Sequence, residues 1–285
     1  MKVSLNGSII ENEEAAIRAE TDGLFYGAGC FETFKSYRGK FLHLDRHLHR
    51  LNDAVSYLTG QKAGFFTEEQ VRLEITELLK ANQLSEDHAR IRIQVSLGER
   101  GGYSLPDANE PSFITLITSD EVALKAAGPL RLVSVNTTVV PSSCRPTQLK
   151  LSNMMHYRQA AIEAKAKGAD DALMLTVRDE VAETSIANIF WEKNGTIFTP
   201  SATCDILPGI TRSILIQMGS ESGNRIKEGA FSGSDIEQAS QIWICNSLKE
   251  LVWVSSLNGR PYPTDTPLRH DLLQKFEGYK KEKMA

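Results

Sequence analysis

The 285-residue sequence lacks several features that would assign it to common classes of protein. It has no apolar run long enough to cross a bilayer, and its opening residues, MKVSLNGSII, contain no apolar stretch of the signal-peptide kind. Its 32 lysines and arginines nearly balance its 36 aspartates and glutamates, so the net charge of −4 argues against a basic surface for nucleic acid or anionic lipid. We therefore expect a cytoplasmic globular protein with no nucleic-acid or membrane partner.

The motifs of metal enzymes and serine hydrolases are missing as well. The four cysteines are scattered without a CxxC pair, which argues against a disulfide framework or a zinc site. His43, His47 and His49 lack the carboxylate pattern of zinc hydrolases, so we expect no metal. There is no GxSxG, and the glycines of GAGCFE (27–32) precede a strand-like segment, whereas a dinucleotide-binding loop opens a helix.

What the sequence does contain is two successive groups of strands and helices. Residues 1–118 combine short strand patterns with two amphipathic helix patterns, the second running from Thr67 to Asn82. Residues 119–128 are expected to form a linker, and 129–285 form a second cycle with a strong hairpin signal at Asn194-Gly195. The pattern predicts an α+β protein with a smaller N-terminal and a larger C-terminal domain.

One lysine has two competing interpretations. Lys150 lies between two leucines, after an expected strand at 130–140 and before an expected helix at 154–168. Most lysines in such a place are solvated, but an apolar setting also favours the neutral amine that a nucleophilic lysine needs. This stretch alone does not separate the two interpretations.

Four polar features match one cofactor better than they match separate roles. Taken singly, Arg50, Lys150, Glu183 and the segment PGITR (208–212) would each be an ordinary surface or turn feature. Together they match pyridoxal 5′-phosphate (PLP), whose aldehyde requires an amine that has lost its proton far below the usual pKa of ~10.4. A carboxylate can keep the ring nitrogen protonated, and a helix N-terminus with an arginine suits the phosphate.

These residues carry a resemblance to a known family. From YGAGCFETFKSYRGK through HLHRL, the Lys150 stretch and ETSIANIFWEKNGTIFTP to LPGITR, the sequence resembles the class IV aminotransferases, which are fold-type IV PLP enzymes. That family includes branched-chain and D-amino-acid aminotransferases and 4-amino-4-deoxychorismate lyases. The resemblance implies a two-domain fold of the D-amino-acid aminotransferase kind, with PLP at the domain interface, and a homodimer.

The resemblance also implies a set of cofactor-binding residues. Lys150 would form the Schiff base with PLP, and Glu183 would be the partner of the pyridine nitrogen. The implied phosphate ligands are Arg50, the backbone of Ile210 and Thr211, and Ser247.

Within the family, three places resemble the lyases more than the aminotransferases. The segment ICNSLKEL resembles a lyase segment that puts Asn246 on the substrate side of the pocket. The loop GERGGYS (98–104), with Arg100 and Tyr103 as expected substrate contacts, resembles the lyases' glycine-rich loop and is expected to act as a lid. Leu97 stands where D-amino-acid aminotransferases have a carboxylate-binding arginine. The lyases often have an arginine near this position too, so Leu97 departs from both patterns, and Arg100 is the expected substitute.

Two residues of the segment CFETF complete the expected site. Phe31 is expected beside the substrate, and Thr33 matches a lyase threonine whose hydroxyl could relay a proton near Lys150. A β-branched strand residue that packs inward would explain Thr33 equally well.

These features predict a PLP-dependent lyase that converts 4-amino-4-deoxychorismate to 4-aminobenzoate and pyruvate for folate synthesis. The alternative is a branched-chain or D-amino-acid aminotransferase that uses 2-oxoglutarate. A PLP-binding homologue without activity is a third interpretation, which the complete set of cofactor-side residues disfavours.

Overall fold

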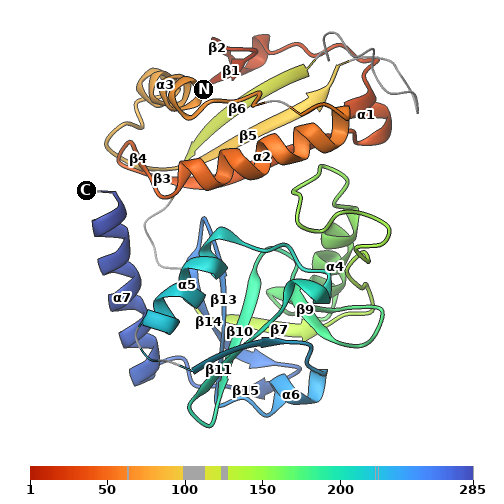
Figure 1. Cartoon of the computed structure of the whole chain (residues 1–285), viewed down its shortest axis with the longest axis vertical. Helices are drawn as coiled ribbons and strands as arrows, with labels where there is room; N and C mark the ends of the chain where they lie inside the picture. Colours follow the sequence, from red (N-terminus) through yellow and green to blue (C-terminus); the bar gives the residue numbers. More distant parts are fainter. Residues whose placement is uncertain (63, 99–112, 123–127, 222, 224, 285) are drawn as a thin grey trace. The chain divides into compact units, whose positions relative to one another are not determined.

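The chain divides into two compact units. The computed structural model describes residues 1–285 except 63, 99–112, 123–127, 222, 224 and 285 (Figure 1). The first unit comprises Met1–Lys125 and Leu149–Asn153, and the second comprises Ala126–Gln148 and Met154–Lys283. Lys150 therefore belongs to the first unit, although the residues on both sides of its segment belong to the second.

The first unit is a six-stranded antiparallel sheet in the order β2-β1-β6-β5-β3-β4. Helix α2 (Leu44–Thr59) contacts β3, and α3 (Glu68–Ala81) contacts β1 and β6. A short helix, α1 (Asp22–Tyr26), precedes β3. The strands are β1 (Lys2–Leu5), β2 (Ser8–Glu11), β3 (Gly29–Tyr37), β4 (Lys40–Phe41), β5 (His88–Leu97) and β6 (Phe113–Glu121).

The sequence pattern explains how α3 begins and ends. The side chain of Thr67 accepts a hydrogen bond from the backbone N–H of Gln70, which is the arrangement of an N-cap. The helix is followed by Asn82, as predicted, and its apolar face is buried in the core of the unit. The buried side chains of that face are Val71, Ile75, Leu78 and Leu79.

The second unit contains a nine-stranded mixed sheet in the order β12-β11-β10-β13-β14-β7-β8-β9, with β15 paired to β14. The pairs β11–β12, β14–β7 and β7–β8 are parallel. The strands are β7 (Leu130–Ser134), β8 (Asp171–Leu175), β9 (Val181–Thr184), β10 (Asn188–Lys193), β11 (Thr196–Pro200), β12 (Arg225–Gly229), β13 (Gln241–Asn246), β14 (Glu250–Leu257) and β15 (Arg260–Pro261). The helices are α4 (Met155–Ala166), α5 (Ile210–Glu221), α6 (Gly233–Glu237) and α7 (Pro267–Lys283).

Two hairpins of the second unit turn at Asn-Gly pairs, and the turn predicted at Asn194-Gly195 is confirmed. Asn194 and Gly195 join β10 to β11 with φ of 52° and 72°, and Asn258 and Gly259 join β14 to β15 with φ of 52° and 82°. Two successive positive φ values define the type I′ turn that suits the twist of a hairpin.

Two predicted elements have different bounds in the structure. The strand predicted at 130–140 is wrong beyond Ser134, where β7 ends. Val135 and Val139 are nevertheless buried, because they pack with Ala160 and Ala164 of α4. Their backbone N–H groups still donate to β8, from Val135 to the carbonyl of Leu173 over 3.3 Å and from Val139 to that of Leu175 over 3.0 Å, so only the regular pairing stops at Ser134. Strand β6 ends at Glu121, within the range expected as a linker.

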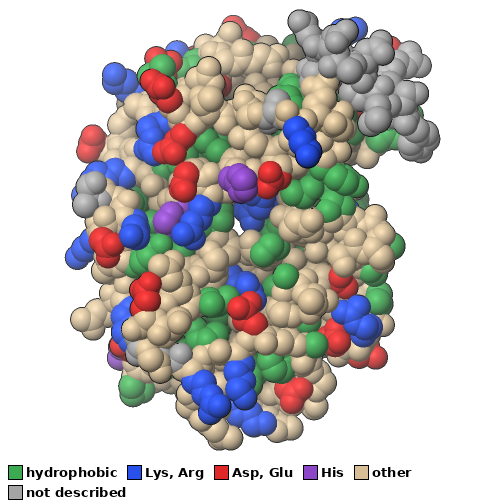
Figure 2. Space-filling model, viewed as in Figure 1, with side chains coloured by type: hydrophobic (Ala, Val, Ile, Leu, Met, Phe, Trp, Pro, Cys, Tyr) green, Lys and Arg blue, Asp and Glu red, His purple; other side chains and the backbone are tan. Residues whose placement is uncertain are grey.

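The visible surface carries charges of both signs. Figure 2 shows lysine and arginine side chains interspersed with aspartate and glutamate, as the small net charge predicts. Within the described part of the chain, no helix is long and apolar enough to cross a membrane.

Candidate active site

Residues 149–153 attach to the first unit by pairing with the start of β3. The backbone N–H of Phe31 donates to the carbonyl of Lys150 over 2.9 Å, and Ser152 N–H donates to the carbonyl of Gly29 over 2.8 Å. Cys30 and Leu151 form an antiparallel bridge between these two bonds. A Cβ at Gly29 would lie 2.6 Å from the carbonyl oxygen of Val95, so this close backbone approach requires glycine.

Lys150 is half-buried, and the leucines on both sides of it are buried in the core of the first unit. Its Nζ lies 5.0 Å from the centroid of the Phe31 ring, a cation–π contact. Thr33 is two residues from Phe31 along β3 and therefore lies on the same face of the sheet. Lys150, Phe31 and Thr33 thus share the less buried face of the first unit's sheet.

Arg92 lies on this face too, and the sequence analysis missed it. Its guanidinium carbon lies 3.9 Å from the Phe31 ring centroid, and Arg92 is the residue of β5 that pairs with Thr33. Burial lowers the pKa of Arg92, and the nearby charge of Arg90 adds to the effect. The signal in the sequence was the alternation of polar and apolar residues in ARIRIQV (89–95), which puts Arg90 and Arg92 on the same face of one strand.

Arg50, expected to bind phosphate, forms a bidentate ion pair within the first unit. Its Nε donates to Oε1 of Glu32 over 2.6 Å and its Nη2 donates to Oε2 over 2.9 Å. His47 Nδ1 lies 2.7 Å from the same Oε2. Burial alone would raise the pKa of Glu32, but the charge of Arg50 and the hydrogen bond with His47 lower it well below its usual range. The carboxylate fixes the orientation of the guanidinium fork.

In the second unit, Glu183 near the end of β9 is 4 % exposed and accepts hydrogen bonds on both carboxylate oxygens. The hydroxyl of Tyr157 donates to Oε1 over 2.5 Å, and the backbone N–H of Leu207 donates to the same oxygen over 3.1 Å. Asn188 Nδ2 donates to Oε2 over 3.0 Å. Sequence reasoning identified Glu183 but missed Tyr157 and Asn188, which come from α4 and β10.

Asn188 also ties Glu183 to the loop that opens α5. Its Nδ2 donates to the carbonyl of Leu207 over 2.8 Å. A Cβ at Gly209 would lie 2.2 Å from Oδ1 of Asn188, so glycine is what lets this amide lie against the loop. Helix α5 begins at Ile210, the next residue, and its first N–H groups have no acceptor within the helix. Thr211 is in this first turn.

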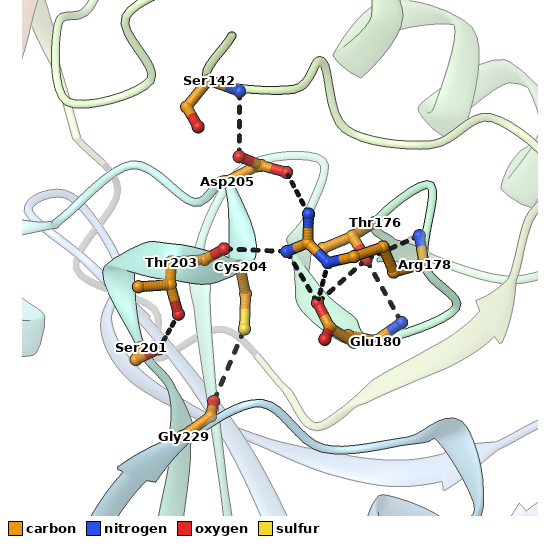
Figure 3. A network of polar contacts seen from close by, with 9 residues as sticks. All are labelled: Ser142, Thr176, Arg178, Glu180, Ser201, Thr203, Cys204, Asp205 and Gly229. Atoms are coloured by element: carbon orange, nitrogen blue, oxygen red, sulfur yellow. Dashed lines mark hydrogen bonds and ion pairs between the residues drawn. The ribbon is translucent and has the colours of Figure 1, made fainter.

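A polar network anchors the other end of the same loop (Figure 3). Asp205 is buried, and its backbone adopts the left-handed conformation with a φ of 57°. Its Oδ1 accepts a 2.9 Å hydrogen bond from the N–H of Ser142. The guanidinium of Arg178 donates to the carbonyl of Thr203 over 2.9 Å and lies 3.8 Å from Oδ2 of Asp205. Glu180 accepts from Arg178 Nε over 3.0 Å, which fixes the guanidinium plane.

The arginine that ends the PGITR segment, Arg212, connects elements of the second unit to one another. Arg212 is 5 % exposed, and its Nη2 donates to the carbonyl of Pro200 over 2.7 Å and to Glu228 Oε2 over 2.6 Å. These contacts tie α5 to the end of β11 and to β12.

Ser247 is half-buried in the turn that joins β13 to β14, and Asn246 organises this turn. Oδ1 of Asn246 accepts from the N–H groups of Leu248 (3.0 Å) and Lys249 (2.7 Å). Its Nδ2 donates to the carbonyl of Ile186 over 3.0 Å. The amide expected at the substrate side of the pocket is therefore engaged in the backbone of two neighbouring turns.

Two of the expected substrate contacts, Arg100 and Tyr103, lie outside the described residues, as does most of the expected lid. Leu97 is 9 % exposed at the end of β5, and its N–H donates to the carbonyl of Ala28 over 2.9 Å. Among the residues that the structure describes, no group of three or more His, Cys, Asp or Glu side chains could hold a metal ion.

The chemistry of the donors fits the cofactor expected from the resemblance. In the second unit, a helix N-terminus and the Ser247 hydroxyl suit a phosphate, and a buried carboxylate suits a protonated ring nitrogen. In the first unit, the amine of half-buried Lys150 lies over a phenyl ring, which is a setting for a nucleophilic amine.

Comparison with known proteins identifies relatives over nearly the whole length of the chain. A model of the family "Amino-transferase class IV" matches residues 29–257. The chain is 28% identical to the aminodeoxychorismate lyase of Bacillus subtilis, over 98% of this chain and 94% of the relative. It is 24% identical to the D-alanine aminotransferase of Listeria monocytogenes, over 91% and 88% of the two chains. The branched-chain aminotransferase of Thermoproteus uzoniensis, solved with norvaline, superposes with a TM-score of 0.86 at 25% identity, covering 100% of this chain and 95% of that one.

Proposed function

We propose, from the premise that the chain belongs to the class IV aminotransferases, that it is a 4-amino-4-deoxychorismate lyase. The resemblance drawn from the sequence is confirmed by the family match, and the chain is a PLP-dependent enzyme of the two-domain fold-type IV kind. The reaction would release 4-aminobenzoate and pyruvate. The likeness to the Bacillus subtilis lyase over nearly the whole chain supports this choice.

The cofactor-binding roles are assigned residue by residue. Lys150 would bind the cofactor's aldehyde carbon, and Glu183 would hold the proton on its ring nitrogen. The phosphate would accept hydrogen bonds from Ser247 and from the first N–H groups of α5. Arg50, whose guanidinium is held by Glu32, would pair with the phosphate. PLP, when bound, supplies an electron sink for the bond that is broken at the amine-bearing carbon.

The residues of the first unit would move the protons of the reaction. The substrate's amine would first take the place of Lys150 on the cofactor's aldehyde carbon, which frees the amine of Lys150. The freed Nζ would take the proton from C4 of the substrate, after which the bond from C3 to the enolpyruvyl oxygen breaks and the ring becomes aromatic. Lys150 would then displace the amine of 4-aminobenzoate and release it. The released enolpyruvate takes a proton on its methylene carbon and becomes pyruvate. Thr33 Oγ1 would relay a proton between Lys150 and the leaving group.

One observation carries the choice of a lyase: Thr33 and Lys150 lie on the same face of the sheet. A transaminase returns the abstracted proton to the cofactor, whereas a lyase must also protonate a leaving group, and a hydroxyl on the lysine's face of the sheet would serve that step. The alternative explanation of Thr33, inward packing, is weakened because the residue is half-buried while its neighbours Glu32 and Phe34 are buried on the other face.

The test is the rate of pyruvate formation from 4-amino-4-deoxychorismate by the wild type and two variants. Thr33→Val keeps the shape and removes the hydroxyl, so we expect kcat to fall by about 10²-fold, the low end for a lost proton-transfer group. Thr33→Ser should retain most of the rate. An equal rate for Thr33→Val would overturn the role of the hydroxyl.

The alternative function is an aminotransferase, and Arg92 bears on both reactions. Arg92 offers a partly buried cation 3.9 Å from the Phe31 ring, on the face that carries Lys150. A guanidinium in this place suits the carboxylate of an amino acid or of 2-oxoglutarate, and it suits a carboxylate of the lyase substrate equally well. Arg92→Leu, which keeps the bulk, should raise KM more than it lowers kcat.

The cellular role follows from the proposed reaction and the family resemblance. We propose that the 4-aminobenzoate feeds folate synthesis and that the protein acts as a homodimer. Light scattering on the purified protein would measure the mass of the assembly, and the mass of one chain, 31.6 kDa, would contradict the dimer.

A further inference from the structure

The turn that contains Ser247 ends at a residue with an unusual backbone conformation. Glu250, the first residue of β14, has a φ of 60° and pairs with Asn246 across a three-residue connection, 247–249. Glycine is the usual residue at a left-handed position of such a hairpin, since any other L-residue costs about 1–2 kcal/mol there. A glutamate at this place therefore calls for a compensating contact.

Helix α7 supplies that contact. Lys280 is 6 % exposed, and its Nζ donates to Oε2 of Glu250 over 2.7 Å. The carboxylate of Glu277, one turn earlier on α7, lies 2.6 Å from the same Nζ. Lys280 also lies over the Phe276 ring, at 5.4 Å from its centroid. A lysine this well buried is costly unless it is paired, so the Glu250 contact is a strong constraint on both residues.

The helix itself is fixed in the second unit. Its inner side chains Leu272, Phe276 and Tyr279 are buried, and it contacts α5 (Figure 1). It lies beyond residues 29–257, the part of the chain that the family model matches. The contact from Lys280 to Glu250 thus joins α7 to a turn that lies within the matched residues.

We propose that α7 positions the turn 246–250 through the ion pair of Lys280 and Glu250, and that this holds Ser247 for the phosphate of the cofactor. One end of the turn is fixed by the hydrogen bonds of Asn246 to Leu248, Lys249 and Ile186. The other end is fixed by the buried lysine. Lys280 and Glu250 are positioning residues, since they act through Ser247, and the inference rests on the proposed phosphate role of that serine.

The test compares PLP with pyridoxal, which lacks the phosphate. Dissociation constants for both are measured by equilibrium dialysis against the full-length protein, for the wild type, Lys280→Met, Lys280→Arg and the control Lys283→Met. Lys283 lies in the last turn of the same helix, is half exposed, and pairs with its neighbour Glu282. Thermal unfolding of each variant shows whether it folds.

The expected result is specific to the phosphate. Lys280→Met should weaken PLP binding by about tenfold, the low end of what loss of an outer-shell partner costs at a metal site, and pyridoxal binding by less than about twofold. Lys280→Arg, which can still pair with Glu250, should restore PLP binding to within about threefold. Lys283→Met should bind both compounds as the wild type does.

Two results would overturn this inference and leave the proposed function unaffected. One is equal weakening of PLP and pyridoxal in Lys280→Met, which would mark a general structural role. The other is an unchanged affinity for PLP. Should Lys280→Met fail to fold, Glu250→Gly makes the same test. Glycine adopts the positive φ without strain, and Glu277 still pairs with Lys280, so this variant should fold and lose PLP affinity. A wild type that binds PLP no better than pyridoxal would overturn the proposed function together with this inference.

Discussion

The hydroxyl of Tyr157 donates a 2.5 Å hydrogen bond to Oε1 of Glu183. Burial raises the pKa of Tyr157 well above its usual value of 10, and the carboxylate of Glu183 raises it further. The phenol therefore stays protonated, and stays a donor, throughout the pH range in which the enzyme would work. This contact connects α4, which begins a few residues after Lys150, to the carboxylate proposed to face the ring nitrogen.

We predict that Tyr157→Phe loosens Glu183 without removing it. The variant leaves a buried carboxylate oxygen with one donor fewer, which should cost about 1–3 kcal/mol in the free energy of unfolding. Urea denaturation measures that cost, and a pH titration of the visible absorption of the bound cofactor reports the change at the ring nitrogen. An unchanged titration would show that Tyr157 supports the fold alone.

A second prediction concerns Lys150. Lys150→Ala should fold as the wild type does, because the half-buried side chain contributes little to the core, whose adjacent members Leu149 and Leu151 remain. The variant should lose the visible absorption that the wild type acquires with PLP, and kcat should fall by about 10⁴-fold if the amine is the proton acceptor. A variant that keeps both the absorption and the rate would contradict the assignment.

The buried carboxylate of Glu32 should stabilise the first unit. Glu32→Gln leaves the charge of Arg50 without its bidentate partner, and breaking a buried pair in this way should lower the free energy of unfolding by about 3–5 kcal/mol at neutral pH. Glu68→Gln, which removes an exposed pair with Arg72 on α3, is the control and should change it by less than about 1 kcal/mol. A similar loss in both variants would argue against a special role of the buried pair.

The same cluster predicts how stability depends on pH. The pKa of Glu32 in the folded protein lies below its ordinary value of 4.5, so its contribution is complete above that pH and is lost as the pH falls below it. Burial lowers the pKa of His47 below its ordinary 6.5, although the contact with Glu32 opposes this. The unfolded chain therefore binds a proton first as the pH falls, and stability should begin to decline below about 6.5 and decline more steeply below about 4.5. In Glu32→Gln the steeper part should be smaller.

The network of Figure 3 should support the loop that opens α5. Arg178→Ala removes the cation beside Oδ2 of Asp205 and the donor to Thr203, and we expect a loss of about 1 kcal/mol, because Arg178 is itself half exposed. Arg131→Ala is the matched control, since Arg131 forms a bidentate pair with Asp170 at a similar exposure, away from this loop. Only Arg178→Ala should also weaken PLP binding. Equal PLP affinity in the two variants would show that the network has no influence on the cofactor.

Local patterns predicted the elements whose causes are local. The Asn194-Gly195 turn needs two left-handed residues in succession, and α3 needs a cap and an apolar stripe, all of which can be read within a few residues. By contrast, the strand expected at 130–140 ends at Ser134, although Val135 and Val139 are buried against α4 and still donate to carbonyls of β8. The apolar pattern shows that these valines are buried, but it does not show where regular strand pairing stops.

The sequence predicted only some residues of the candidate site, because the others come from segments that are distant along the chain. Lys150, Glu183 and Arg50 were identified from residue type and resemblance, but the partners that orient them come from distant segments. Glu32 is the partner of Arg50, and the signal was a carboxylate at a buried position of an alternating strand. The pairing of Leu151 with Cys30 joins residues far apart in sequence, so no pattern could show that the Lys150 segment returns to the first unit.

The central claim, that this chain is a lyase, is tested most directly by the products it forms. Purified protein with PLP is incubated with 4-amino-4-deoxychorismate and, separately, with D-alanine or a branched-chain amino acid plus 2-oxoglutarate. The account predicts equal amounts of pyruvate and 4-aminobenzoate in the first reaction, none with Lys150→Ala, and no glutamate in the second. Glutamate in the second reaction without pyruvate in the first would contradict it.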